Sequence, residues 1–135
     1  MQKIDEISYN LIKNSLNASE IRKAVIAHNM ANLNTKGFKA SKVVFEDKLN
    51  GALTGNKLPL KTTHDKHIKG VNSPLDIKPE VVKDNSTSMR RDGNNVDIDN
   101  EATNLAANGI LYNALINQAN SRIQMRRYAI NEGRR

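Results

Sequence analysis

Helix-breaking residues are distributed very unevenly along the chain. Residues 4–32 contain neither Pro nor Gly, whereas residues 34–95 contain all three Pro and five of the seven Gly. Residues 99–131 carry a single Gly. Because Pro removes a backbone donor and Gly loses the most conformational entropy on folding, long helices are confined to the two ends of the chain. The distribution therefore predicts a mainly α protein with a long helix at each end.

We expect these two helices to pair antiparallel, in coiled-coil fashion, and to form one helical domain. The first helix and the turn that follows it would occupy residues 1–39, and the second helix residues 93–135. Residues 40–92 read as a variable, loop-rich middle region. Within it, the valine-containing segments 42–45 and 80–83 are compatible with short β-strands between turn signals.

The first segment has apolar residues at steps of three and four, which places them on one side of a helix. The helix would hold about 28 residues and measure about 42 Å at 1.5 Å per residue. Continuing the stripe brings polar residues to positions where apolar ones are expected, and such residues usually set the register between helices. The stripe consists of Ile4, Ile7, Leu11, Ala18, Ile21 and Val25, with Asn14, His28 and Asn32 as its polar positions.

The last segment repeats this pattern. Asp97 or Asp99 is a candidate N-cap, and Arg126 and Arg127 suit the negative end of the helix dipole. Gly109 inside the helix costs about 1 kcal/mol relative to Ala, and the simplest reason for it is close approach of a neighbouring helix, with chance as the alternative. The stripe consists of Ala102, Leu105, Tyr112, Ile116, Ala119, Ile123 and Ile130.

Composition narrows the class of protein. The chain has 135 residues, the size of one domain, with a net charge of +7, 4% aromatic residues and no Trp. The absence of Cys excludes a disulfide scaffold, a Cys-based zinc site and a Cys nucleophile. No apolar run approaches the ~18 residues of a transmembrane helix. A pair of helices with wide apolar stripes leaves apolar surface exposed, which predicts protein partners.

Motifs for catalysis or metal binding are weak. His64 and His67 have a spacing found in metal sites, but the only other His is His28 on the predicted first helix, and a metal needs three or four ligands. The sequence contains no triad-like set and no paired carboxylates in a catalytic pattern. We therefore expect no enzyme activity, no cofactor, no metal and no small-molecule substrate.

The positive charge alone invites a nucleic-acid partner. The Lys and Arg residues, however, are spread along the chain, aromatic stacking platforms are few, and no reading-helix motif is evident. A basic surface that meets an acidic protein partner accounts for the charge equally well. We do not expect nucleic-acid binding.

The most informative segment is residues 31–39, with the sequence ANLNTKGFK. It reads as a helix stop, in which Asn34 and Thr35 offer side-chain hydrogen bonds, Gly37 permits positive φ and Phe38 anchors the exit. The pattern ANxxTxGFK also resembles the signature of the flagellar basal-body rod and hook proteins. The residues that carry the signature are Ala31, Asn32, Thr35, Gly37, Phe38 and Lys39.

The rest of the chain agrees with this resemblance, which covers nearly its whole length. Members of the family pair long terminal helices, and residues 92–101 with the helix that follows resemble the short proximal rod subunits. The resemblance implies a structural subunit of the periplasmic rod, which transmits torque. It also implies a chain that is synthesised in the cytoplasm, is monomeric in solution, polymerises with other rod subunits and contacts the base protein of the basal body.

The resemblance further implies export through the flagellar type III apparatus without a cleaved signal, and no apolar signal region follows Met1. In this family the export gate recognises a Phe with an aliphatic residue four positions later. Phe45 and Leu49 match that pattern, although Phe45 alternatively packs within the assembled rod. The alternative function is a soluble helical adaptor or export-chaperone-like binding module, which leaves residues 32–39 unexplained.

Overall fold

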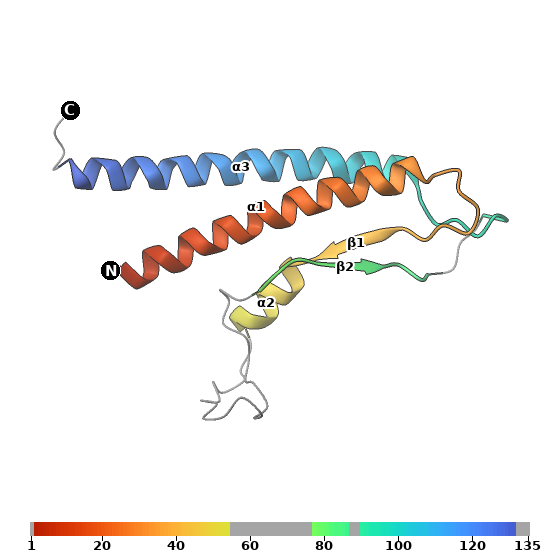
Figure 1. Cartoon of the computed structure of the whole chain (residues 1–135), viewed down its shortest axis with the longest axis horizontal. Helices are drawn as coiled ribbons and strands as arrows, with labels where there is room; N and C mark the ends of the chain where they lie inside the picture. Colours follow the sequence, from red (N-terminus) through yellow and green to blue (C-terminus); the bar gives the residue numbers. More distant parts are fainter. Residues whose placement is uncertain (1, 55–76, 87–89, 132–135) are drawn as a thin grey trace, which may run out of the picture.

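The computed structural model describes residues 2–54, 77–86 and 90–131, with side chains from Ile7 onward (Figure 1). Its elements are α1 (Gln2–Ala31), β1 (Ser41–Val44), α2 (Glu46–Thr54), β2 (Glu80–Lys83) and α3 (Ile98–Ile130). The fold is mainly helical, and α1 and α3 lie side by side in opposite directions (Figure 1). The predicted fold class is confirmed. No helix within the described ranges is both long and apolar enough to cross a membrane.

Local chemistry sets the two ends of α3. Asp97 is the N-cap, and its side chain accepts a hydrogen bond from the backbone N–H of Asp99 at 3.0 Å. Of the two N-cap candidates in the sequence, Asp97 is therefore the one that caps α3. Asp99 lies in the first turn and Arg127 in the last, where their charges interact favourably with the helix dipole.

Helix α1 lies between two layers, with α3 on one side and the small sheet and α2 on the other (Figure 1). Ala18 is buried in a cluster with Phe45 and Ile77, against which Leu49 and Ala52 pack. Its neighbour along the chain, Ser19, instead bonds to Asn108 of α3. Ala18 belongs to the apolar stripe predicted for the first helix. It therefore packs on the side of α1 that faces α2 and the sheet, and not against α3.

The two strands form an antiparallel sheet in which Ser41 pairs with Lys83 and Val44 with Glu80. Their positions follow the two valine-containing segments of the sequence. The helix α2, in contrast, was not predicted, because the middle region was interpreted as loops and strands only. Its nine residues include Gly51, and a segment this short gives little periodicity to detect. An ion pair between Lys48 and Glu80 joins it to β2.

The interior is small and unusually polar. Among the described residues, the buried hydrophobic side chains are Ala18, Ile26, Phe45, Ile77 and Val96, and the buried polar ones are Ser19, Asn29, Asn94 and Asn108. Hydrogen bonds therefore take a large share in fixing how the elements pack.

The buried polar positions of the helix pair differ from those predicted. His28 is exposed, and its ring lies at a tilt 5.5 Å from the ring of Phe38. Between the helices, Ser19 and Asn108 bond reciprocally: the Ser19 hydroxyl donates to Oδ1 of Asn108 at 2.9 Å, and Nδ2 of Asn108 donates to the Ser19 carbonyl at 2.9 Å. The periodicity missed these two residues because each lies beside the apolar stripe rather than on it.

Candidate functional site at the end of α1

The signature segment forms a compact turn directly after α1. Nδ2 of Asn32 donates to the His28 carbonyl at 2.8 Å, which satisfies one of the free carbonyls at the helix end. The hydroxyl of Thr35 donates to Oδ1 of Asn32 at 3.2 Å, and the Phe38 N–H donates to the Thr35 carbonyl at 3.2 Å. Asn32 and Thr35 therefore organise the turn through their own side chains.

A residue about 60 positions further along the chain holds this turn from outside. Asn94 is fully buried, and its Nδ2 donates to the carbonyls of Asn32, Leu33 and Thr35 at 3.0, 2.9 and 2.9 Å. Its Oδ1 accepts from the Val96 N–H at 2.8 Å. Both polar atoms of one side chain thus fasten the signature turn to the segment that leads into α3.

Two glycines meet where these segments touch. Gly37 and Gly93 have φ of 72° and 76°, a conformation that disfavours other residues. The positive φ predicted for Gly37 is thus observed. Its N–H donates to the Asp92 carbonyl at 2.8 Å. A Cβ added to Gly93 would lie 3.8 Å from the Cα of Gly37, so the two backbones pass close together.

Two further asparagines fasten the strand that follows. Oδ1 of Asn95 accepts from the Ala40 N–H at 2.7 Å, and its Nδ2 donates to the Asp84 carbonyl at 2.9 Å. Asn29 of α1 pairs with the backbone of Ser41, accepting from its N–H at 3.0 Å and donating to its carbonyl at 2.8 Å. In these bonds an asparagine amide takes the place of a backbone amide, as in a strand pairing.

The remaining signature residues lie around this turn. Ala31 is the last residue of α1 and is exposed. The Lys39 ammonium donates to the Ser86 carbonyl at 2.9 Å, and Phe38 is half-buried beside His28. Asn94 and Asn95, which the sequence analysis did not single out, lie in the part of residues 92–101 that resembles the rod proteins.

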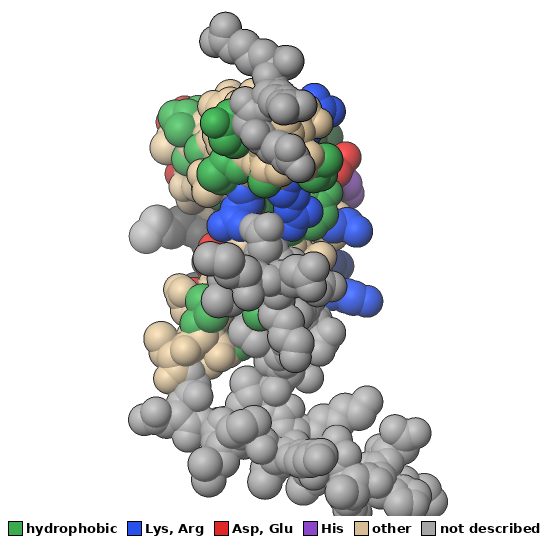
Figure 2. All heavy atoms as spheres, turned by 90° about the vertical axis from the view of Figure 1, so that its left-hand side faces the viewer, with side chains coloured by type: hydrophobic (Ala, Val, Ile, Leu, Met, Phe, Trp, Pro, Cys, Tyr) green, Lys and Arg blue, Asp and Glu red, His purple; other side chains and the backbone are tan. Residues whose placement is uncertain are grey.

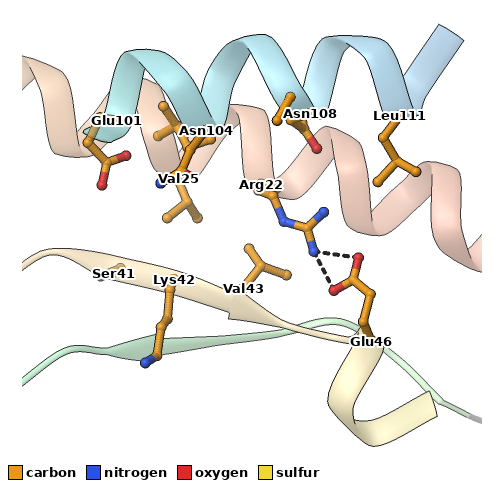
Figure 3. A pocket seen from close by; sticks show the side chains of 12 residues that line it. Arg22, Val25, Ser41, Lys42, Val43, Glu46, Glu101, Asn104, Asn108 and Leu111 are labelled. Atoms are coloured by element: carbon orange, nitrogen blue, oxygen red, sulfur yellow. Dashed lines mark hydrogen bonds and ion pairs between the residues drawn. The ribbon is translucent and has the colours of Figure 1, made fainter. Parts of the chain in front are cut away.

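A cavity of about 400 Å³ lies beside the site, between α1, α3 and β1 (Figure 3). At its α2 end, Arg22 binds both oxygens of Glu46 at 2.7 and 2.6 Å. Burial acts to raise the pKa of Glu46, but the Arg22 hydrogen bonds and charge hold that pKa below its ordinary value.

Glu101 lines the other end of the same cavity. Its Oε1 accepts from Nδ2 of Asn29 at 3.2 Å, while its Oε2 is buried and meets no hydrogen-bond donor among the described residues. Burial raises the pKa of Glu101, and the charge of Asp97 adds to this effect, although the Asn29 hydrogen bond opposes it. The ionised form is thus disfavoured in the folded chain.

The two residues suggested for export recognition lie together in the fold. Phe45 is only 2% exposed and packs against Ala18 and Ile77, and Leu49 is half-buried in the same cluster. A partner that binds the Phe45 side chain must therefore do so before the chain folds.

The predicted stripe residues are divided between the helix pair and the surface. Ile4 lies in the first turns of α1, where side chains are not described. Half-buried positions are Leu11, Ile21, Val25, Leu105 and Ile116. More exposed are Ile7, Tyr112, Ile123 and Ile130, at 39, 40, 39 and 79%. His64 and His67 fall outside the described residues, and no cluster of three metal-ligating side chains occurs in the part that is described.

The structure contains the features on which the resemblance to flagellar rod and hook proteins depends: two long antiparallel helices, a signature turn after the first and apolar surface on the pair. Sequence comparison with known proteins identifies the family. The chain is 39% identical over 119 residues to the flagellar basal body rod protein FlgB of Borrelia hermsii, covering 84% of this chain and 88% of that one. It is 38% identical to FlgB of Borreliella burgdorferi over 107 residues, or 76 and 79% of the two chains.

A more distant relative covers more of the chain. FlgB of Bacillus subtilis is 32% identical over 123 residues, which are 91% of this chain and 92% of that one. No family model matches. The chain belongs to the FlgB family of flagellar basal body rod proteins, which confirms the resemblance found in its sequence. The names of these relatives describe a structural rod component rather than an enzyme.

Replacing Asn94 tests whether its amide holds the signature turn. Asn94→Ala removes the donor shared by three carbonyls, and we expect a loss of about 2–4 kcal/mol in the free energy of unfolding, measured by urea denaturation. Asn94→Asp keeps the shape but turns the donor into an acceptor, so it should be no more stable than Asn94→Ala at neutral pH. The exposed Asn85→Ala is the control. An Asn94→Ala protein as stable as this control would contradict the assignment.

The buried carboxyl of Glu101 predicts a pH-dependent effect. Because its pKa is raised in the folded chain, its contribution to stability is present below the unfolded pKa and is lost as the pH rises through the folded pKa. Glu101→Gln should therefore melt at a higher temperature than the parent protein at pH 7, and the difference should shrink as the pH falls towards 4. Glu20→Gln, at an exposed position, should change the melting temperature little at either pH. Equal melting temperatures of Glu101→Gln and the parent at pH 7 would refute this prediction.

Proposed function

We propose that this chain is a structural subunit of the flagellar basal-body rod and assembles at its proximal end with other rod subunits and the base protein. The observation that carries this proposal is the match to rod proteins over most of both chains. The apolar side chains left exposed on α1 and α3 support it, because such surface is typical of a subunit that completes its burial against neighbours.

The small core suggests how assembly stabilises the subunit. Few large side chains are buried within the described residues, so the isolated chain gains little from apolar burial. Contacts with neighbours bind the folded form only and so shift the equilibrium towards it. Contacts between different faces of identical subunits, repeated without closure, build a helical polymer. On this proposal the subunit is monomeric before it reaches the rod.

Export before folding fits the position of Phe45 and Leu49. We include in the proposal that the flagellar type III export apparatus recognises these two residues in the unfolded chain. The burial of Phe45 against Ala18 and Ile77 supports this order of events, because folding hides the side chain. The same burial gives Phe45 a second role, in packing.

Genetic complementation tests the proposed function. The full chain, expressed in a strain that lacks its own proximal rod subunit, should restore rods on purified basal bodies seen by electron microscopy. A chain that ends at residue 100 lacks most of α3 and should leave the membrane ring without a rod. Failure of the full chain to restore rods, although it is made and exported, would contradict the proposal. So would rods built from the truncated chain.

The export assignment predicts different effects for two residues of one buried cluster. Phe45→Ala should lower the amount of chain secreted through the flagellar apparatus several-fold, because it removes the proposed recognition side chain. Ile77→Ala weakens the same cluster by a comparable large-to-small change, about 2–5 kcal/mol, but leaves Phe45 and Leu49 intact. Secretion of Ile77→Ala should stay at the parental level. Equal secretion of both variants would assign Phe45 to packing alone.

A further inference from the structure

The strand β2 has an outer edge that pairs with no other strand in the described part of the chain. In an antiparallel sheet, successive residues direct their backbone N–H and C=O groups to alternate sides of the strand. The Asp84 N–H donates to the Ala40 carbonyl at 2.8 Å, so the backbone groups of Asp84 face β1. By alternation those of Val82 also face β1, and those of Val81 and Lys83 face the outer edge.

The outer edge of β1, in contrast, is already occupied. Both backbone groups of Ser41 are bonded to the side-chain amide of Asn29 in α1, at 3.0 and 2.8 Å. The strand β1 therefore lies between α1 and β2 (Figure 1). A further strand can be added to this sheet at β2, but not at β1.

Both faces of β2 also lack cover. Val81 and Val82 point to opposite faces of the sheet, because side chains alternate along a strand. Their exposed fractions are 50% and 37%. A sheet of two strands is marginally stable by itself. A third strand would place its own side chains beside these two valines and would add cross-strand pairs on both faces.

The two acidic side chains at this edge already have partners within the chain. Glu80 forms an ion pair with a lysine of α2. Hydrogen bonds from Ser86 lower the pKa of Asp84, and the positive charges of two nearby lysines add to this effect. Neither carboxylate therefore leaves an uncompensated negative charge beside β2.

The cations at the two ends of β2 are not compensated in this way. Lys78 precedes the strand and Lys83 ends it, and both are exposed. Neither makes an ion pair with another of the described residues. The whole chain has a net charge of +7, and Lys and Arg are more prominent than Asp and Glu on the face shown in Figure 2. Charge complementarity at this edge therefore favours an acidic partner.

We propose that the outer edge of β2 binds an extended, acidic segment of another protein as a third strand of the sheet. The backbone groups of Val81 and Lys83 bond to the backbone of that segment, which is the usual mode of strand addition. Its acidic side chains lie beside Lys78 and Lys83, and its apolar side chains beside Val81 or Val82. Pro79 has no N–H, so it limits the pairing at the start of the strand.

A second copy of this chain is a poorer occupant of the edge. It would bring the same excess of positive charge to the contact, and Lys and Pro on an edge strand discourage pairing between like edges. The proposal goes beyond the rod function, because it concerns the sheet and not the pair of long helices.

Peptide binding to the full chain tests the proposal without the use of rods. The probe is a synthetic peptide with blocked ends, Glu-Val-Thr-Val-Glu, and the control is Lys-Val-Thr-Val-Lys. Both read the same in either direction, so the orientation of the added strand does not affect the result. We expect the acidic peptide to bind about tenfold more tightly, or better, than the basic one. It should also slow hydrogen exchange, followed by NMR, at the N–H groups of Val81 and Lys83.

Substitutions at two positions separate strand addition from folding. Val81→Pro removes an outward N–H, and an edge strand tolerates Pro where the N–H faces solvent. It should abolish binding of the acidic peptide, whereas Val81→Thr should bind it like the parent. Slow exchange of the Asp84 N–H, which is bonded to Ala40, shows in each variant that β1 and β2 are still paired. Lys83→Glu keeps the backbone unchanged and should make the basic peptide the tighter ligand.

Several results would overturn the proposal. They are no binding of the acidic peptide by the parent chain, equal binding of the two peptides, or binding that leaves exchange at Val81 and Lys83 unchanged. An unaltered peptide preference in Lys83→Glu would do the same, and this variant decides the question if Val81→Pro disrupts the sheet. Exchange that slows at Val81 and Lys83 with rising chain concentration, in the absence of peptide, would assign the edge to a second copy instead.

Discussion

The amide of Asn94 is the interaction on which the arrangement of the chain depends. Its nitrogen holds three carbonyls of the turn after α1, and its oxygen holds the backbone that leads into α3. The end of one long helix and the start of the other are thereby tied at a single buried point. That tie places the end of α1 beside the segment that leads into α3, as their antiparallel arrangement requires.

Hydrogen bonds from other polar side chains also fix how the elements pack. Asn29 and Asn95 position the backbone next to β1, and Asn108 joins the two helices through Ser19. Hydrogen bonds are directional, so they fix register with little apolar area. A subunit held together in this way can leave much of its apolar surface available to neighbours, which suits a protein of the rod family.

The two long helices and their antiparallel pairing were predictable, because periodicity and the placement of Pro and Gly are local signals. The positive φ of Gly37 followed from its place after a helix. The helix α2 was missed, since nine residues that include Gly51 give too little periodicity. Asn94 was missed for a different reason: its partners lie about 60 residues away, and no pattern within a window reveals such a contact. The sequence predicted that the α3 stripe is apolar. It could not show which residues of that stripe the helix pair leaves exposed.

The hydrogen bonds and the strand pairing that join the two halves of the chain affect when the chain can fold. The turn after α1, the strand β1 and Ser19 find their partners between residues 80 and 108. Whichever half of the chain is free first, it lacks the partners of these particular contacts until the other half follows. The contacts that join α1 to the start of α3 can therefore form only once residues up to 108 are available.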